Sequence, residues 1–299
     1  STSTVARRAE TTDSGSYEAF STSARDTQLL VSACRPGQPD EEVVDVRAGE
    51  AGRAHARDVG PLLAELSEQL RAEGFSVSTE QTWLESPHQT VIAAQQSEGC
   101  SLVIKQHRRD SILKKAFLTP EDRKLLRYCP CPVLMVKSDA PWSGRNILAA
   151  VDVGNSDSEH QTLHAGIVGH AHDIARLCQG QLHVLSAHPS PMLSAADPTF
   201  QLKESIEQRY REACRKFQED YEIEDRCLHI EEGPADVLIP KVAHQLNAAV
   251  TVIGTVARTG LAGALMGNTA EVVLDSLESD VLVLKPEDII QHLETLLQR

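Results

Sequence analysis

Short runs of aliphatic and β-branched residues recur along the chain and predict buried strands. The clearest run, Val250–Ile253, ends at Gly254 and is followed by a loop, a helical pattern of apolar residues from Gly267 to Leu277, and a second run, Val281–Leu284. A continuous apolar run of four or five residues suits a parallel strand that is buried on both faces. This stretch therefore predicts a strand, a loop, a helix and a second strand.

The rest of the hydrophobic pattern predicts strands that alternate with helices, as in layered α/β proteins. The expected strands cover 28–34, 75–83, 101–105, 131–137, 146–151 and 181–187. The expected helices lie in the second part of 40–71, over 86–96, over about 159–177, after Gly233-Pro234 and in a tail over 287–299.

The second half of the chain repeats the layout of the first. Ser279–Lys285 follows the similar run Cys131–Lys137 at an offset of 148 residues, and Gly233-Pro234 corresponds to Ser86-Pro87 as a helix start. We therefore expect two tandem, doubly wound, mostly parallel five-stranded sheets with helices on both faces. The offset places the opening strand of the first repeat at residues 1–4, which read Ser-Thr-Ser-Thr. That strand is expected to be missing, displaced or strongly diverged, so the first repeat is incomplete.

These observations predict four segments. The first repeat covers 1–137, a linker rich in turn residues covers 138–145, the second repeat covers 146–286 and the helical tail covers 287–299. Residues 1–27 are polar with few apolar anchors, a composition typical of a weakly ordered arm. The last strands of the two repeats are β-branched edge strands, so they can pair across a pseudo-twofold axis and make the chain mimic a dimer.

The loop between the last two runs has features of an anion site. A glycine at the end of a strand lets the backbone turn sharply and approach a ligand. The pair Gly267-Asn268 at a helix start presents free N–H groups and the positive end of the helix dipole, which attract phosphate. From the spacing alone, an ordinary connection without a ligand is an equally good interpretation.

The same residues resemble a known family. The spacing from Gly254 through Ala257 to Gly267-Asn268 resembles the nucleotide loop of the universal stress proteins, Gly-x2-Gly-x9-Gly-(Ser/Thr), and 280–286 resembles their last strand. Ala257 replaces the second glycine and Asn268 replaces the serine or threonine, but both keep a backbone N–H. The resemblance covers 146–286 well and 28–137 loosely, and it implies a tandem member of this family.

The resemblance implies that the second repeat binds an adenine nucleotide, ATP, with or without Mg²⁺. Asp152, at the end of the opening strand, would face the adenine side, although an aspartate that begins a helix is an equal alternative. The loop residues Gly254, Ala257, Gly267 and Asn268 would surround the phosphates. Arg258 can reach a phosphate or remain solvated. Thr269 can cap the following helix or also touch phosphate.

Charge and composition argue against some classes of binding partner. The formal net charge is −14, from 29 basic and 43 acidic residues, which argues against nucleic-acid binding and against anionic membrane surfaces. No apolar run of 18 residues and no signal-peptide pattern is present, so a cytoplasmic location is expected. The seven scattered cysteines are expected to be reduced thiols, and Cys129-Pro130-Cys131 is interpreted as half-buried packing.

Two further groups of residues invite other ligands. The first repeat breaks the loop, because Leu118-Thr119-Pro120-Glu121 stands where the second has Met266-Gly267-Asn268-Thr269, and a proline and a glutamate oppose phosphate there. A basic group can hold another anion, although a solvated face is the simpler interpretation. It comprises Lys105, Arg108, Arg109, Lys114 and Lys115. His160 and His164, one helical turn apart, can share a metal, but a solvent-facing helix is simpler.

No catalytic motif stands out, so at most slow ATP hydrolysis is expected. The expected function is therefore that of a nucleotide-binding protein that acts in stress signalling through an unidentified protein partner, as a pseudo-dimer within one chain that can also form a homodimer. The alternatives are a scaffold whose nucleotide site has decayed, a slow ATP hydrolase, and a metal or anion sensor.

Overall fold

The computed structural model describes most of the chain outside its N-terminal arm and several loops. The described residues are 25–34, 43–50, 64–65, 67–72, 74–82, 86–107, 118–138, 140–155, 157–192, 195–255 and 268–297. Residues 1–24 of the expected arm lie outside this set. The last three residues of that arm, 25–27, belong to the first strand, so they are not an unstructured extension.

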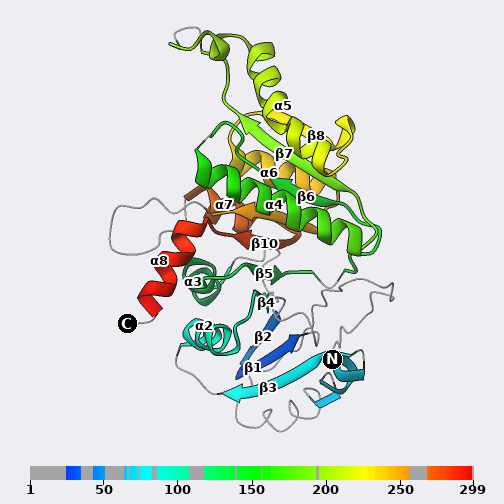
Figure 1. Ribbon diagram of the computed structural model, residues 1–299, viewed down its shortest axis with the longest axis vertical. Helices are drawn as coiled ribbons and strands as arrows, with labels where there is room; N and C mark the ends of the chain where they lie inside the picture. The colour runs from blue at the N-terminus through cyan, green and yellow to red at the C-terminus, as the bar shows by residue number, and fades with distance from the viewer. Residues whose placement is uncertain are drawn as a thin grey trace.

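The described strands form one ten-stranded sheet, in the order β3-β1-β2-β4-β5-β10-β9-β6-β7-β8 (Figure 1). The strands are β1 (Arg25–Cys34), β2 (Val43–Glu50), β3 (Ser76–Thr82), β4 (Leu102–Gln106), β5 (Val133–Val136), β6 (Ile147–Ala150), β7 (Leu182–His188), β8 (Leu228–Glu232), β9 (Val250–Gly254) and β10 (Asp280–Leu284). The helices are α2 (Pro87–Glu98), α3 (Pro120–Tyr128), α4 (Ser158–Leu177), α5 (Lys203–Asp220), α6 (Ala235–Gln245), α7 (Asn268–Ser276) and α8 (Glu287–Leu297). Two short 3-10 turns, Pro198–Gln201 and Asp225–Cys227, flank α5.

The second half has the predicted layout. Its five strands are all parallel, and β6, the first in the chain, lies in the middle between β7 and β9. The chain therefore builds outwards from β6 in one direction through β7 to β8, and then in the other through β9 to β10. This is the doubly wound arrangement, in which the order reverses between the first and the fourth strand.

The first half departs from this layout at its beginning. β1 runs antiparallel to both of its neighbours, β2 and β3, whereas β2, β4 and β5 are parallel to one another. The position beside β4 that corresponds to β6 is taken by β2, a segment later in the chain than residues 1–4, where the opening strand was expected. The sequence analysis placed no strand at Val43–Glu50, and it did not foresee that β1 is antiparallel.

The two halves join through β5 and β10, which pair antiparallel with Leu134 opposite Leu282. This central strand pair confirms the expected pairing of the two edge strands, and it makes one continuous sheet rather than two separate ones. Asp280 fixes the chain here, because its buried carboxylate accepts hydrogen bonds from the N–H groups of Lys137 and Ser138 and from the indole Nε1 of Trp142 at 2.7–2.9 Å.

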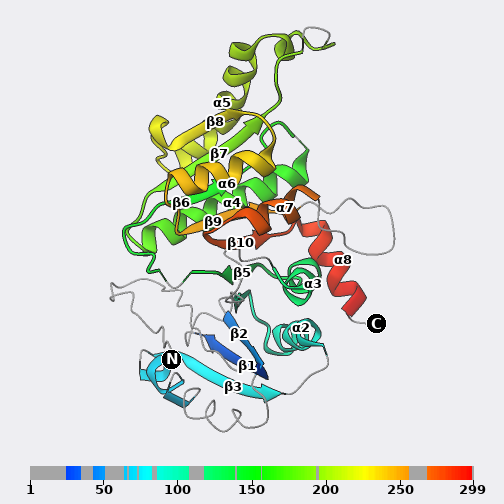
Figure 2. The same ribbon diagram turned by 180° about the vertical axis from the view of Figure 1, so that it is seen from behind.

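Helices cover both faces of the sheet, as expected. One core lies under α2, α3, α6 and α7, and the other lies under α4 and α5 (Figures 1 and 2). Both cores cross the central strand pair, because Met135 and Val281 point into the first while Leu134 and Leu282 point into the second. α8 packs Ile289 and Leu293 near Tyr128 of α3, which ties the C-terminal helix to the first half. Within the described residues, no helix combines the length and apolarity required to cross a bilayer.

The internal repeat extends to the bounds of individual elements. β4 lies 148 positions before β9, and α3 lies 148 positions before α7. β5 lies at the same offset from the end of β10. Residues in one half can therefore be compared with residues at the same place in the other.

Candidate functional site

The candidate site lies at the carboxyl edge of the second half, where β6 and β9 are neighbours. Ala150 pairs with Ile253, so Asp152 and Thr255 follow at adjacent strand ends. The chain leaves β6 towards β7 and leaves β9 towards β10, which makes this the switch point of the sheet. Ligands of doubly wound sheets bind outside the carboxyl ends of the strands at such a point.

Asp152 has an exposed side chain and a fixed backbone. Its carbonyl accepts a hydrogen bond from the N–H of Asn155 at 3.1 Å, which closes a turn before α4. Its own N–H donates to Nε2 of His164 at 3.3 Å. His164 is 4% exposed, and burial lowers its pKa, so the ring is neutral near pH 7 and carries its proton on Nδ1. The turn thus leaves the Asp152 carboxylate directed to solvent while its main chain is held.

His188 and Tyr210 form the neighbouring part of this edge. His188 ends β7, is 1% exposed, and donates from Nδ1 to the carbonyl of Pro189 at 2.9 Å. Its Nε2 is buried and has no partner among the described residues. The Tyr210 ring lies 5.7 Å from the His188 ring, and its hydroxyl sits where a side chain at position 154 would have to lie. Burial, and then the charge of Asp152, raise the pKa of Tyr210. The sequence analysis did not include these two residues, whose proximity comes from packing of α5 over the sheet.

Gly254 ends β9 as expected, and its missing side chain also serves the packing of α4. A Cβ atom there would lie 2.7 Å from Cδ2 of Leu163 and 3.0 Å from Cδ1 of Ile167, both on α4. The residue does not have a positive φ. The glycine therefore allows α4 to pack closely against β9, which accounts for the absent side chain without a ligand. The expected approach of a ligand to its backbone stays a prediction.

The loop that follows, residues 256–267, lies outside the described residues, and with it Ala257, Arg258 and Gly267. α7 begins at Asn268, one residue before Thr269, so Thr269 is in the first turn and is not the N-cap. Its side chain is exposed. The start of α7 and the end of β9 are thus placed as the resemblance implies, while contacts of the loop side chains remain an expectation.

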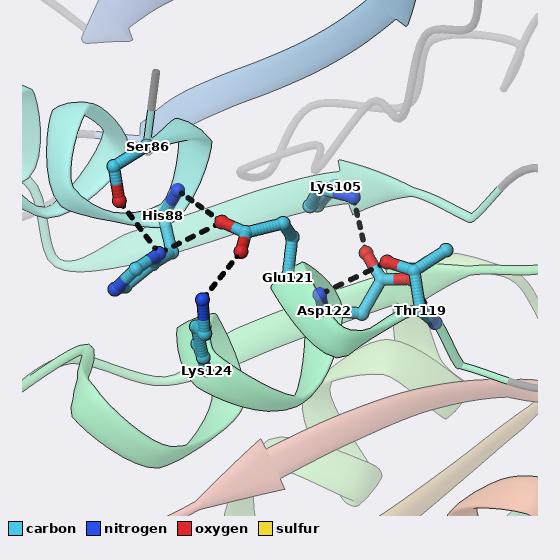
Figure 3. Close-up of polar contacts among 7 residues, drawn as sticks. All are labelled: Ser86, His88, Lys105, Thr119, Glu121, Asp122 and Lys124. Atoms are coloured by element: carbon cyan, nitrogen blue, oxygen red, sulfur yellow. Dashed lines mark hydrogen bonds and ion pairs between the residues drawn. The ribbon is translucent and has the colours of Figure 1, made fainter. Parts of the chain in front are cut away.

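The corresponding place in the first half is filled by the protein's own carboxylate. Asp122 is fully buried at the start of α3, and it accepts a hydrogen bond from the N–H of Thr119 at 2.9 Å. The same carboxylate forms an ion pair with Lys105 of β4 (Figure 3). It also accepts a hydrogen bond at 3.0 Å from Nδ1 of His107, which directly follows β4. An anion is therefore already bound between strand and helix. This agrees with the expectation that phosphate does not bind here.

Lys105 is consequently not part of a solvated basic face, which corrects one interpretation of the basic group. The residue is 7% exposed and its charge is neutralised by Asp122. The other members, Arg108, Arg109, Lys114 and Lys115, lie outside the described residues.

A second polar cluster lies beside the first, between the starts of α2 and α3 (Figure 3). Glu121 accepts a hydrogen bond from Nδ1 of His88 at 2.8 Å and one from Lys124 at 2.8 Å. Ser86 places its hydroxyl 3.2 Å from the same His88 nitrogen. Burial alone would raise the pKa of Glu121, but the hydrogen bonds from Lys124 and His88 lower it overall. Its carboxylate therefore links two helix starts.

The histidines of α4 do not form the solvent-facing row that the sequence suggested. His164 is buried, and His160 donates from Nδ1 to Asp157, the N-cap residue of the helix, at 2.6 Å. Across the part of the chain that the structure describes, no three His, Cys, Asp or Glu side chains are grouped so as to hold a metal ion.

Comparison with known proteins supports these findings. The family model described as the universal stress protein family matches residues 20–137 and again 144–285. Universal stress protein E of Escherichia coli K12 is 32% identical over 222 residues, which cover 72% of this chain and 70% of that protein. A solved structure from Pseudomonas aeruginosa UCBPP-PA14, assigned to the universal stress proteins, is 62% identical, with a TM-score of 0.72 over 85% of this chain and 87% of that one.

A more distant structure shares the fold. The universal stress protein of Archaeoglobus fulgidus DSM 4304 is 19% identical, with a TM-score of 0.53 over 77% of this chain and 79% of that one. The doubly wound second half, the duplicated layout and the two matches of the family model lead to one conclusion: this chain belongs to the universal stress protein family, as a tandem member with two repeats.

Proposed function

We propose that the second half binds an adenine nucleotide, ATP, beyond the carboxyl ends of β6 and β9, and that occupancy of this site alters binding of a protein partner during stress. The observation that carries the proposal is the switch point itself. It brings the end of β6, the end of β9 and the start of α7 to one edge of a parallel sheet. The protein would act in the cytoplasm as a ligand-dependent binding protein.

Each site residue has a proposed task. Asp152 would accept hydrogen bonds from the base or ribose side of the ligand, since its carboxylate is exposed next to the switch point. The backbone N–H groups of Ala257, Gly267 and Asn268 would bind the phosphates, aided by the dipole of α7. Arg258 and Thr269 would contact the same phosphates, and Mg²⁺, where bound, would neutralise part of the phosphate charge. Gly254 would contribute by keeping α4 in place.

The first half is not proposed to bind nucleotide. The Asp122 carboxylate occupies the position between strand end and helix start, and it already uses Lys105, His107 and the N–H of Thr119. A phosphate would have to displace a buried carboxylate from its ion pair with Lys105 and from its hydrogen bond with His107. We therefore expect one nucleotide per chain.

Hydrolysis is not part of the proposal. His164 lies beside Asp152, but its Nε2 lone pair already accepts the N–H of Asp152, so it is not available to take a proton from water. A decayed site in a scaffold is the competing interpretation. The packing role of Gly254 is the observation that favours it, because that glycine does not require a ligand to explain it.

The test is a melting experiment with ATP, ADP and AMP, together with calorimetric titration. A ligand that binds only the folded state, present at one hundred times its dissociation constant, raises the free energy of unfolding by about 2.7 kcal/mol. We expect a clear upward shift in Tm, a stoichiometry of one, and loss of both in Gly267→Glu. The matched control is Thr119→Ala at the corresponding position in the first half, which should lower Tm but keep the nucleotide-dependent shift. No shift with any nucleotide would favour the scaffold.

A further inference from the structure

Two cysteines face each other where α3 leads into β5. Cys129 and Cys131 flank Pro130, and their sulfur atoms are 3.6 Å apart. Both are free thiols, with 0% and 8% of the residue exposed. This is closer packing than the half-buried pair expected from the sequence, and no part of the proposed nucleotide site uses it.

A lysine lies near the pair. Lys285 follows β10 and is buried, and its Nζ has no hydrogen-bond partner among the described residues. Its charge acts on both thiols. A buried ammonium without a partner is costly, so an anion close by would stabilise the folded state.

The other half shows what this position does when cysteine is absent. Lys137, the counterpart of Lys285, donates from Nζ to the carbonyl oxygens of Leu274 and Leu277 at the end of α7. The counterparts of Cys129 and Cys131 are Leu277 and Ser279. One half thus has a lysine that caps a helix, and the other has a lysine without such bonds beside two thiols.

The two thiols differ in acidity. A hydrogen bond from Cys131 holds the pKa of Cys129 below its ordinary value, and the charge of Lys285 acts in the same direction against burial. The hydrogen bond to Cys129 and burial raise the pKa of Cys131. The Cys131 thiol also donates to the carbonyl of Pro132 at 3.5 Å, so Cys131 keeps its proton. A thiolate is the reactive form of cysteine, which leaves Cys129 as the nucleophile and Cys131 as the second thiol that forms the disulfide.

We propose that Cys129, Cys131 and Lys285 form a dithiol centre that reduces hydroperoxides and becomes a disulfide. The Cys129 thiolate attacks the peroxide, the O–O bond breaks, and a sulfenic acid forms while the leaving hydroxide takes up a proton. The Cys131 sulfur then attacks the sulfenic sulfur, forming the S–S bond and releasing water. In sum, two thiols and one hydrogen peroxide give one disulfide and two waters.

The geometry permits this reaction. The S–S bond requires an approach from 3.6 Å to about 2.0 Å, which side-chain rotation can supply between residues two apart. Cys129 is fully buried and 8% of Cys131 is exposed, so only an oxidant as small as hydrogen peroxide is proposed to react here. A disulfide in so small a ring is strained and therefore easily reduced again, which suits a reversible change.

The test uses the full reduced chain treated with hydrogen peroxide, followed by peptide mass mapping over time. We expect a Cys129–Cys131 disulfide, seen as the loss of two hydrogen atoms, to form before Cys178 is modified, although Cys178 is the more exposed thiol. In Cys131→Ser, the sulfenic acid at Cys129 should persist and be trapped by dimedone. Lys285→Met should slow oxidation about tenfold, which corresponds to about one pKa unit in the attacking thiol.

The matched control is Lys137→Met, which removes the counterpart lysine and should leave the oxidation rate of the cysteines unchanged. Oxidation of Cys129 and Cys131 in the unmodified chain no faster than that of Cys178 would overturn the proposal, whatever the folding of the variants. Equal rates of cysteine oxidation in Lys285→Met and the unmodified chain would show that Lys285 has no part in the dithiol centre. Neither outcome depends on nucleotide binding.

Discussion

A single buried carboxylate, that of Asp122, lies between a strand end and a helix start in the first half. Burial alone would raise the pKa of Asp122, but the hydrogen bond from His107 and the charge and hydrogen bond of Lys105 hold it well below its ordinary value. The carboxylate also closes a capping box with Thr119 at the start of α3. The same side chain therefore stabilises a helix, neutralises the charge of Lys105 and accepts a hydrogen bond from His107.

Replacing this carboxylate should produce a pH-dependent loss of stability. Asp122→Asn keeps the shape but removes the charge, leaving Lys105 buried without its partner, so we expect a loss of about 3 kcal/mol at pH 7. Because the folded-state pKa lies below the unfolded value of about 3.9, this contribution is present above that pH and is lost as the pH falls through the folded pKa. Urea unfolding of both proteins should therefore show a difference that narrows below about pH 4.

The control is Glu121→Gln, the adjacent acid, whose side chain is 30% exposed. Its pairs with His88 and Lys124 are screened by solvent, so it should change stability by less than about 1 kcal/mol. An Asp122→Asn effect of equal size at pH 7 and pH 3 would contradict the account of the buried ion pair.

At the scale of elements, α3 and α7 meet across the pseudo-twofold axis through reciprocal charges. Arg123 pairs with Asp275, and Arg127 pairs with Glu271. Arg123 is the counterpart of Glu271, and Arg127 is the counterpart of Asp275, at the offset of 148 residues. In a symmetric dimer of identical units the same positions would carry the same charge and repel. Here one helix is basic and the other acidic, so the two halves are complementary.

Reversing the charges of one helix should weaken this contact, and reversing both should restore it. Arg123→Glu with Arg127→Glu places four acids together, and we expect a loss of about 1 to 2 kcal/mol at low salt, because the side chains are 22–31% exposed and partly screened. Adding Glu271→Arg and Asp275→Arg should recover most of it. Chemical unfolding of four proteins (the unmodified chain, each reversed pair alone and both together) gives the coupling energy directly. Independent, additive effects of the two pairs of changes would contradict the reciprocal arrangement.

Most elements could be predicted from the sequence because their signals are local. The run Val250–Ile253, the start of α2 at Ser86-Pro87 and the helix after Gly233-Pro234 all lie where expected. The strand β2 was missed, because its neighbours in space, β1 and β4, are set by long-range pairing that no local pattern reveals. The Asp122 cluster was missed for the same reason, since Lys105 and Asp122 are separated by a loop and look like surface charges in the sequence.

At the scale of the whole molecule, the central strand pair determines which edges are exposed. β10 is covered on one side by β9 and on the other by β5. Without the first half, β10 would become an edge strand with unpaired N–H and C=O groups, which favours pairing with another copy. The acids of α7 would then face the same acids of the second copy.

We therefore expect the isolated second half, residues 144–299, to dimerise weakly at low salt and more strongly as salt rises. Salt screens the repulsion between Glu271 and Asp275 of one copy and the same residues of the other. The Debye length falls from about 10 Å at 0.1 M to about 3 Å at 1 M ionic strength, so dimerisation should strengthen as salt rises. Sedimentation at both ionic strengths measures the change. The full chain, in which Arg123 and Arg127 already neutralise these acids, is the control and should show no such dependence. A half that stays monomeric in both buffers would argue against self-pairing of β10.

The antiparallel join of β5 and β10 lies inside one polypeptide, so dilution cannot separate the copies. Subunits that are made as separate chains can pair in any combination. A mixture of altered and unaltered subunits therefore gives homodimers as well as heterodimers. A covalent tether removes that sorting and fixes the ratio at one to one. Under the proposed function, the first half need not bind a nucleotide and still pairs permanently with the second half.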